Sequence, residues 1–301
     1  MYEEFKERLE STISTGIIEN ELMNRHTTFK VGGPCSVFIS PKKNEIPKAI
    51  KLCQEYDVPY IILGRGSNVL FSDKGYDGVV IEMGEANNDI TVDDTVITAG
   101  AGATLAAVAM KAYENGLAGF EFASGIPGSI GGGLYMNAGA YGGEMKDVVV
   151  SAEAMDINGN LITLEREDMD LSYRHSAFMV RDLIVMSVTI RLNKGDKADI
   201  KALMDDFNGR RRDKQPLNYP SAGSFFKRPE GNYAGKLIED AGLAGLRVGG
   251  AEVSSKHCGF IINVDNATSD DIIELMKKVQ DEVKKQFGVD LEPEVKFVGS
   301  F

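Results

Sequence analysis

Two glycine-rich loops are the segments of this sequence best suited to holding a phosphate group. The first is Gly64-Arg65-Gly66-Ser67-Asn68, and the second runs from Ser124 through Gly133 and continues to Ala140. Because glycine has no side chain, consecutive backbone N–H groups can approach a pyrophosphate closely and form an anion-binding nest. A tight turn alone can explain the first loop. The second loop is too dense in glycine for one turn and predicts a ligand-binding segment.

The glycine patterns of the common nucleotide-binding folds do not match these loops. The segments 64–69 and 100–105 both lack the third glycine of the dinucleotide fingerprint, although a predicted strand precedes the second and a predicted helix follows it. No lysine follows either loop in the manner of a P-loop. The Rossmann and P-loop alternatives are therefore not supported.

Four polar groups are candidates for chemistry on a bound substrate, and each also has a purely structural explanation. Arg174 can clamp a carboxylate, or it can be an exposed arginine. The basic run at 210–214 can bind phosphate in an acidic protein, or it can be the cationic end of a helix. Ser224, between Gly223 and two phenylalanines, can protonate a basic carbanion or can bond a turn. Glu294, beside a short apolar strand, is either functional or a surface glutamate.

The remaining composition excludes several classes of function. The three histidines lie in no hydrolase or metalloprotease motif, and the three cysteines have neither disulfide nor zinc-site spacing, so no metal is expected. A formal net charge of −12 argues against a general nucleic-acid binder. No apolar run is long enough to span a membrane, and the acidic N-terminus is not a signal peptide, so a cytoplasmic protein with reduced thiols is expected.

The predicted elements indicate an α+β fold with two domains. Helices are expected over residues 1–15, 44–56, 104–115, 196–211 and 268–287, with Asn44 capping the second and Thr268 the last. Strands are expected over 36–40, 59–63, 78–83, 90–99 and 183–192, and a hairpin is expected at Asn158-Gly159. The polar break at 193–196 is the predicted domain boundary. Strands and helices do not alternate regularly, which disfavours a doubly wound sheet.

Six motifs together resemble the UDP-N-acetylenolpyruvoylglucosamine reductase (MurB) family, from about residue 24 to residue 299. They are Thr28–Gly33, Leu63–Asn68, Gly125–Gly132, Tyr173-Arg174, Ala222–Lys227 and Leu291–Val295. The N-terminal motifs alone would indicate only the wider class of FAD-binding oxidoreductases. A sugar or hydroxy-acid oxidase of that class has no need of the Gly-Ser-Phe-Phe-Lys and Glu-Pro-Glu segments. A non-catalytic nucleotide-sugar binding protein is the alternative from another class.

The resemblance implies non-covalent FAD, NADPH as hydride donor, a UDP-sugar substrate and a role in peptidoglycan precursor synthesis. It implies an FAD-binding region over residues 1–195, with two subdomains divided near 85–90, and a smaller α+β substrate-binding domain over 196–301. The implied catalytic residues are Arg174, Ser224 and Glu294. The expected substrate-binding residues are Tyr173, Arg210, Arg211, Lys214, Gly223 and Lys227. The expected cofactor-binding residues are Gly64, Arg65, Gly66, Ser67, Asn68, Ser124, Gly125, Ile126, Gly128, Ser129, Ile130, Gly131, Asn137 and Ala138.

The chain departs from one branch of that family. That branch carries an inserted tyrosine-bearing loop that closes over the substrate, and the segment from Arg174 to Ser224 is too short to contain it. Arg228-Pro229 stands where the longer branch is expected to have an asparagine. The chain therefore resembles the shorter branch, and how it holds the substrate diphosphate is an open question at this stage.

Overall fold

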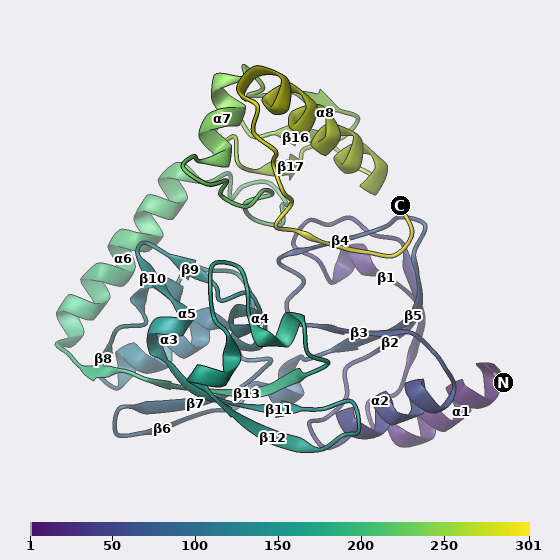
Figure 1. The fold of residues 1–301 in the computed structure, drawn as a ribbon. Helices are drawn as coiled ribbons and strands as arrows, with labels where there is room; N and C mark the ends of the chain where they lie inside the picture. Colours follow the sequence, from purple (N-terminus) through teal and green to yellow (C-terminus); the bar gives the residue numbers. More distant parts are fainter. Residues whose placement is uncertain (1) are drawn as a thin grey trace. The chain divides into compact units, whose positions relative to one another are not determined.

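A computed structural model describes residues 2–301 and divides them into two compact units. The first contains the chain up to Glu19, Val37–Arg65 and Gly78–Arg211, and the second contains Asn20–Ser36, Gly66–Asp77 and Arg212–Phe301. Figure 1 gives the element labels. The two units are defined by packing within the chain. The predicted division between residues 195 and 196 separates a cofactor-binding region from a substrate-binding region, and it stays a prediction.

The first unit begins with a small layer of helix on sheet. Helices α1 (Tyr2–Thr12) and α2 (Ile46–Glu55) pack together, with the Phe5 and Tyr56 ring centroids 5.7 Å apart. The sheet has the order β1-β2-β5-β3, and β3 pairs with β5 in parallel. Asn44 is not the cap of α2, because the residue before the helix is Glu45, which makes no side-chain cap bond. The strands are β1 (Ile18–Leu22), β2 (Pro34–Ile39), β3 (Tyr60–Leu63) and β5 (Tyr76–Glu82).

A five-stranded antiparallel sheet of order β12-β11-β13-β7-β6 forms the rest of the first unit's framework. The predicted hairpin at Asn158-Gly159 is confirmed, and Asp156 accepts hydrogen bonds from the N–H groups of Asn158 and Asn160. The single strand predicted over 90–99 is instead a hairpin that turns at Asp94 (φ 51°). The strands are β6 (Ile90–Asp93), β7 (Val96–Gly100), β11 (Val149–Met155), β12 (Leu161–Glu165) and β13 (Ile184–Arg191).

Short helices and strands connect this sheet to the glycine-rich loops. Thr104, which was expected to lie in the helix, is its cap: the hydroxyl accepts from the Ala107 N–H, and Gly116 lies just beyond the helix with a φ of 65°. The elements are α3 (Leu105–Glu114), β8 (Leu117–Ala118), α4 (Ile130–Tyr135), β9 (Gly139–Ala140), β10 (Gly143–Glu144) and α5 (Met145–Val148), with the 3-10 helices η1 (Met23–Arg25), η2 (Glu85–Asn87), η3 (Glu121–Ala123), η4 (Arg166–Met169) and η5 (Ala177–Met179).

The predicted boundary at 193–196 is not a free linker. Asn193–Lys194 form β14, which pairs with β8, and the Gly195 N–H donates to the Gly116 carbonyl at 2.9 Å. The following helix, α6 (Lys197–Lys214), extends about one turn beyond the expected end. The polar break therefore contains a short paired strand, and its role as a domain boundary stays a prediction.

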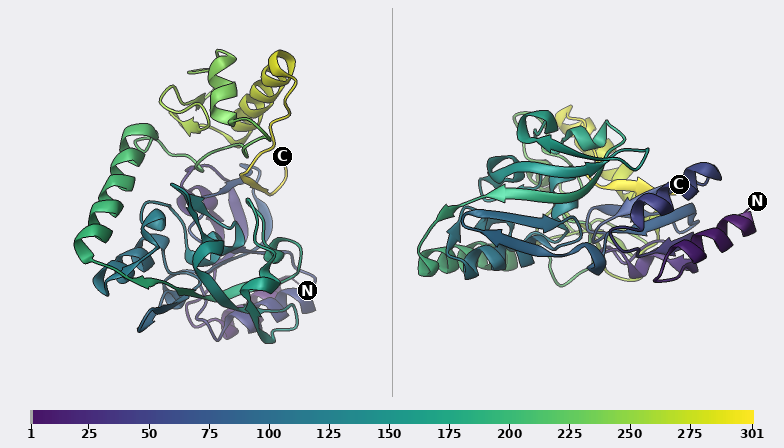
Figure 2. Two further views of the ribbon diagram at one scale, coloured as in Figure 1. Left: turned by 60° about the vertical axis from the view of Figure 1, so that its left-hand side comes forward. Right: turned by 90° about the horizontal axis from the view of Figure 1, so that it is seen from below.

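The second unit packs α7 (Ala234–Asp240) and α8 (Ser269–Phe287) beside the antiparallel sheet β15-β16-β17 (Figures 1 and 2). The predicted apolar stripe of α8, Ile272, Met276, Val279 and Val283, is buried. A parallel pair joins β4 (Val69–Phe71) to β18 (Lys296–Val298) across more than two hundred residues of sequence. The sheet strands are β15 (Arg247–Val248), β16 (Ala251–Val253) and β17 (Ile261–Asn263). The α+β prediction is confirmed.

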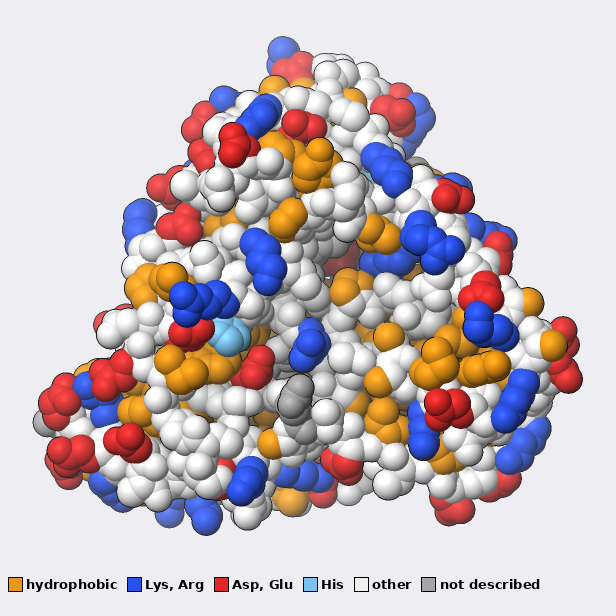
Figure 3. All heavy atoms as spheres, turned by 180° about the vertical axis from the view of Figure 1, so that it is seen from behind, with side chains coloured by type: hydrophobic (Ala, Val, Ile, Leu, Met, Phe, Trp, Pro, Cys, Tyr) orange, Lys and Arg blue, Asp and Glu red, His pale blue; other side chains and the backbone are white. Residues whose placement is uncertain are grey.

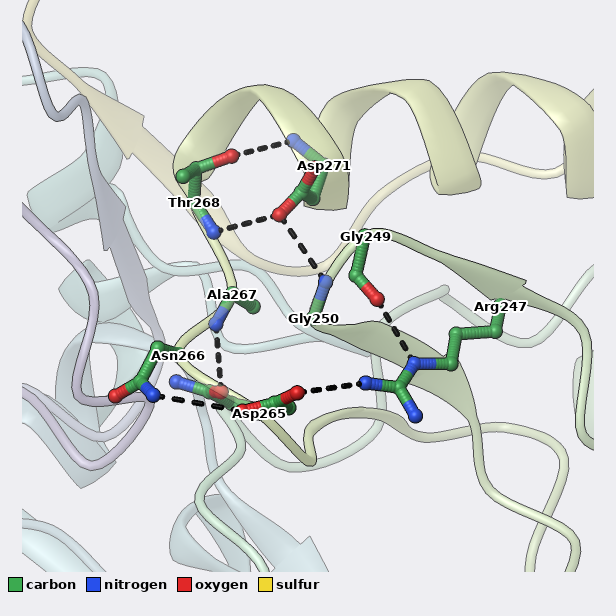
Figure 4. A network of polar contacts seen from close by, with 9 residues as sticks. Arg247, Gly249, Gly250, Asp265, Asn266, Ala267, Thr268 and Asp271 are labelled. Carbon is green, nitrogen blue, oxygen red and sulfur yellow. Dashed lines mark hydrogen bonds and ion pairs between the residues drawn. The ribbon is translucent and has the colours of Figure 1, made fainter.

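A polar network ties the start of α8 to the β15–β16 turn (Figure 4). The Thr268 hydroxyl accepts from the Asp271 N–H at 3.0 Å, and the Asp271 carboxylate accepts from the N–H groups of Thr268 and Gly250 at 2.9 and 3.2 Å. Burial raises the pKa of Asp271, but these backbone donors outweigh it and lower the pKa below its ordinary value. Asp271 thus caps the helix and holds the turn at once.

Charged side chains of both signs lie on the surface (Figure 3), and the thiols are buried. Figure 3 shows Lys and Arg side chains interspersed with Asp and Glu on one face, without a single-sign patch. All three cysteines are buried and free, and burial raises the pKa of Cys35 to about 11 and that of Cys53 to about 12. Within residues 2–301, no helix has the length and apolarity needed to cross a bilayer, and no group of three or more potential ligands could hold a metal ion.

We expect Asp271→Ala to lower the free energy of unfolding by about 1–2 kcal/mol at pH 7, because it removes a cap and the support of Gly250. Asp270→Ala is the matched control, since Asp270 lies in the same first turn and is exposed. It should change stability by less than about 0.5 kcal/mol. Urea unfolding measures both.

The penalty of Asp271→Ala should also depend on pH. Because the folded state lowers the pKa of Asp271 beneath 3.8, its contribution is complete at neutral pH and is lost as the pH falls through that lowered value. Equal destabilisation by the two substitutions at pH 7 would contradict the capping role.

Candidate functional site

The two glycine-rich loops meet within the first unit at Gly64 and Ser129. Gly64 follows β3, and a Cβ placed on it would lie 2.4 Å from the Ser129 Oγ. Ser129 is buried and caps α4, its Oγ accepting from the Gly132 N–H at 3.3 Å. A side chain on Gly64 would therefore collide with the Ser129 hydroxyl that caps α4, and its absence lets the first loop approach the second. Glycine-rich backbone of this kind forms a cradle that suits a phosphate-containing cofactor.

The segment before α3 supports the second loop from behind. The Ile130 N–H donates to the Ala103 carbonyl at 2.7 Å, and the Gly131 N–H donates to the Ala101 carbonyl at 3.0 Å. A Cβ on Gly131 would lie 2.8 Å from that of Ala101. The N–H groups of Ile130 and Gly131 thus bond within the protein, and the expected contact of these residues with the cofactor stays a prediction. The segment Gly100-Ala101-Gly102-Ala103 does not match the dinucleotide fingerprint, but its small residues are the sequence feature that could have indicated this close packing.

Helix α6 covers the beginning of the second loop. The Asn208 Nδ2 donates to the Ser124 Oγ at 3.2 Å, and a Cβ on Gly125 would lie 2.4 Å from Asn208 Oδ1 and 3.2 Å from Arg211 Cδ. Burial lowers the pKa of Arg211, and nearby Tyr141 opposes that shift. An arginine remains charged at neutral pH in spite of such a shift. The half-buried cation Arg211 thus flanks the loop. From the sequence alone, Arg211 could not be distinguished from the other basic residues at 210–214.

The other members of the basic run differ from Arg211. Arg210 is exposed and pairs with Asp206 one turn earlier, with Nη2 and Oδ2 2.7 Å apart. Lys214 is exposed at the last residue of α6 and belongs to the second unit. Residues three or four apart share a face of a helix, whereas adjacent residues do not. The basic residues at 210–214 are neighbours in sequence but therefore point in different directions from α6.

Arg174 and Tyr173 occupy the middle of a tight turn in the first unit. Ser172 and His175 exchange backbone hydrogen bonds at 3.2 and 3.1 Å, and Arg174 has a left-handed φ of 53°. The Arg174 guanidinium carbon lies 5.0 Å from the centroid of the Tyr173 ring, which is half-exposed. A left-handed conformation is uncommon for a residue other than glycine, and it is found where the surrounding structure imposes it.

Ser224 and Glu294 lie on adjacent chain segments of the second unit. The Glu294 N–H donates to the Phe225 carbonyl, and the Lys227 N–H donates to the Glu292 carbonyl, both at 2.8 Å. Phe225 and Phe226 are buried, whereas Ser224 is exposed and Glu294 is half-buried. Gly223 has a φ of 79°, which other residues rarely adopt, and Lys227 pairs with Glu292. The phenylalanines anchor the segment that presents Ser224.

The end of the first glycine-rich loop lies beside Glu294 in the same unit. Asn68 Nδ2 donates to the Glu294 carbonyl at 3.3 Å, and the Lys296 N–H donates to the Asn68 carbonyl at 3.0 Å. The chain leading to Asn68 passes close to the backbone of His26 at Gly66, where a Cβ would lie 2.0 Å from the His26 carbonyl oxygen. A residue with a side chain would not fit at this position. The parallel pairing of β4 with β18 brings these residues together, and nothing in the local sequence of either segment indicates that pairing.

Comparison with known proteins gives matches along the whole chain. A family model described as an FAD binding domain matches residues 35–165, and one described as the UDP-N-acetylenolpyruvoylglucosamine reductase C-terminal domain matches residues 215–298. The UDP-N-acetylenolpyruvoylglucosamine reductase of Agathobacter rectalis is 50% identical over 298 residues, which cover 95% of each chain.

Two further relatives agree. The reductase of the same name from Caldanaerobacter subterraneus subsp. tengcongensis is 50% identical over 281 residues, which cover 93% of each chain. The crystal structure of UDP-N-acetylenolpyruvylglucosamine reductase (MurB) from Thermus caldophilus has a TM-score of 0.80 at 34% identity, and the match covers 93% of this chain and 98% of that one.

We expect Gly64→Ala to weaken FAD binding by about tenfold or more, because the added methyl group would force the two loops apart. Adding Ser129→Gly should restore most of the affinity, since it removes the clashing Oγ at a cost to the helix cap of only a few tenths of a kcal/mol. Titration of the apoprotein with FAD, followed by flavin fluorescence, measures both.

Gly132→Ala is the matched control, because its Cβ would lie 3.4 Å from the same Ser129 Oγ, which is an ordinary contact. Its FAD affinity should stay within about threefold of the wild type. Normal FAD affinity in Gly64→Ala would show that the cofactor does not use the approach of these loops.

Proposed function

Because the chain belongs to the UDP-N-acetylenolpyruvoylglucosamine reductase family, we propose that it reduces the enolpyruvyl group of UDP-N-acetylenolpyruvoylglucosamine with NADPH, yielding UDP-N-acetylmuramate for peptidoglycan synthesis. It is an FAD-dependent oxidoreductase. The observation that supports the reaction, and not only the cofactor, is the pairing of the Ser224 segment with the Glu294 segment inside the region matched by the reductase C-terminal model.

The cradle at Gly64 and Ser129 fits FAD, and the residues proposed to hold its diphosphate are those of the two loops. When bound, FAD supplies a hydride, received from NADPH, to the methylene carbon of the enol ether. The carbon that bears the carboxylate must then gain a proton. The protein's own tasks are therefore to hold the carboxylate, to stabilise the charge that develops there, and to deliver that proton.

Three residues are proposed for these tasks. Arg174 pairs with the substrate carboxylate by charge-assisted hydrogen bonds, which are strengthened as negative charge grows during reduction. Glu294 positions or polarises the carboxylate by hydrogen bonding, in its protonated form or through a partner group, because an ionised carboxylate has no hydrogen to donate. Ser224, which is exposed on a segment anchored by two buried phenylalanines, donates the proton. The two hydrogens added, one as hydride and one as a proton, balance the loss of the carbon–carbon double bond.

Phosphate recognition is proposed for Arg211 and Lys214, with Tyr173, Gly223 and Lys227 completing the substrate contacts. Arg211 is half-buried beside Gly125, whereas Arg210 is already paired with Asp206 on the exposed side of α6. The chain carries a net charge of −12, so a half-buried cation held beside a glycine-rich loop is a specific feature and not an average property of the surface.

We expect Ser224→Ala to leave FAD binding and flavin reduction by NADPH nearly unchanged, because the proton is needed only after hydride transfer. Reoxidation of the reduced flavin by substrate should slow by roughly 10²–10⁴-fold. Ser224→Cys should recover part of this rate, since a thiol also donates a proton. Stopped-flow spectroscopy resolves the two half-reactions.

Ser221→Ala is the control for this experiment, because it removes a hydroxyl from the same segment three residues earlier. Both half-reactions should survive it. Rapid reoxidation in Ser224→Ala would remove Ser224 from the mechanism, and equal slowing by Ser221→Ala would assign the effect to the fold of the segment.

We expect Arg211→Ala and Lys214→Ala to raise the KM for the UDP-sugar by about tenfold or more at low salt, because hydrogen bonds between charged groups contribute roughly 1.5–3 kcal/mol. Arg210→Ala is the matched control and should change KM by less than about threefold. If the KM is unchanged in all three variants, the basic run is a solvated helix end that does not bind the substrate.

A further inference from the structure

We propose that Asn137 and Ser176 are positioning residues that hold the Arg174 turn in register with the second glycine-rich loop. This inference rests on the proposed function, since it assigns importance to the placement of Arg174. Both side chains are fully buried, with 0% exposure, and both bridge the same two segments of the first unit. Asn137 was also expected to bind the cofactor, and that expectation stays a prediction.

The amide of Asn137 is used entirely within the protein. Its Nδ2 donates to the Ser172 carbonyl at 2.9 Å and to the Glu144 Oε2 at 2.7 Å, and its Oδ1 accepts from the Lys146 N–H at 2.9 Å. Both donors and the acceptor therefore have partners. The Ser172 carbonyl is also the acceptor of the His175 N–H that closes the turn around Arg174. Asn137 thus holds the turn at its first residue, Ser172, by a hydrogen bond.

Ser176 holds the other side of the turn. Its Oγ donates to the Tyr135 carbonyl at 2.7 Å, at the last residue of α4. Tyr135 and Asn137 are two residues apart on the segment that follows the glycine-rich loop, and Ser172 and Ser176 flank Tyr173, Arg174 and His175. Two hydrogen bonds from buried side chains therefore tie both ends of one turn to one short segment.

This arrangement explains how Arg174 keeps an unfavourable backbone conformation. Its φ of 53° would relax if the ends of the turn could move, and a strained residue persists only where its surroundings determine it from several directions. His175 Nε2 also lies 3.1 Å from Asp170 Oδ2, but that pair is more exposed. Asn137 and Ser176 are thus the two buried side chains that hold the turn, and they hold it against the loop proposed to carry FAD.

The decisive test is a double-mutant cycle with Arg174. We expect Ser176→Ala and Asn137→Ala each to slow flavin reoxidation by substrate by roughly 10- to 100-fold, since a displacement of about 1 Å in a positioning group has effects of this size. Flavin reduction by NADPH should stay within about threefold. In an Arg174→Ala background, the same substitutions should slow reoxidation no further, because they act only through Arg174.

A readout independent of turnover accompanies the cycle. Calorimetric titration of the oxidised enzyme with the UDP-sugar should show weaker binding for Ser176→Ala and Asn137→Ala in the Arg174 background, and no change in the Arg174→Ala background. Where Asn137→Ala fails to retain FAD, Ser176→Ala alone decides the question, because it removes one hydroxyl and little volume.

Thr189→Val is the matched control. Thr189 Oγ1 lies 3.1 Å from Thr98 Oγ1 on the neighbouring strand of the same unit, so the variant also loses one hydroxyl hydrogen bond. It should leave both half-reactions unchanged. Additive slowing by Ser176→Ala in the Arg174→Ala background, or an unchanged rate in Ser176→Ala itself, would overturn the positioning role. A normal reoxidation rate in Arg174→Ala would instead contradict the proposed function.

Discussion

The close approach of Gly64 to the Ser129 hydroxyl is the constraint on which the first unit's proposed site depends. A Cβ on Gly64 would lie 2.4 Å from the Ser129 Oγ, so a side chain there would displace the hydroxyl that caps α4. The approach in turn needs β3 to end at that point and α4 to begin at Ser129. The sheet, the α3 turn and α6 are arranged so that the second loop is supported from several sides.

The second unit holds Ser224 and Glu294 at a fixed spacing. It does so with backbone hydrogen bonds between the segment that follows Ser224 and the segment that contains Glu294, backed by Phe225 and Phe226. The parallel pair β4 and β18 then brings Asn68 to the same place. Positions set by backbone bonds over a buried core are better defined than positions on a free loop.

Local patterns predicted local structure well. The cap and the apolar stripe of α8 and the turn at Asn158-Gly159 follow from interactions between residues a few positions apart, and all are present. Pairing between distant segments was not predictable in the same way. The bonds between Phe225 and Glu294, and the strand at Asn193–Lys194, depend on tertiary context that a single sequence does not display. Asn137 shows the same limit within the site. Its place in a glycine-rich motif predicts a ligand contact, which stays a prediction, and only the fold shows that its side-chain amide bonds to Ser172, Glu144 and Lys146.

The central claim is that the two glycine-rich loops together hold FAD, and hydrogen exchange tests it most directly. Backbone amide exchange should be compared, by mass spectrometry, between the apoprotein and the FAD-loaded protein. We expect FAD to slow exchange in both loops, at residues 64–68 and at Gly125, Gly128 and Ser129, since bound phosphate would protect the N–H groups there. Protection confined to other parts of the chain, with both loops exchanging as fast as in the apoprotein, would contradict it.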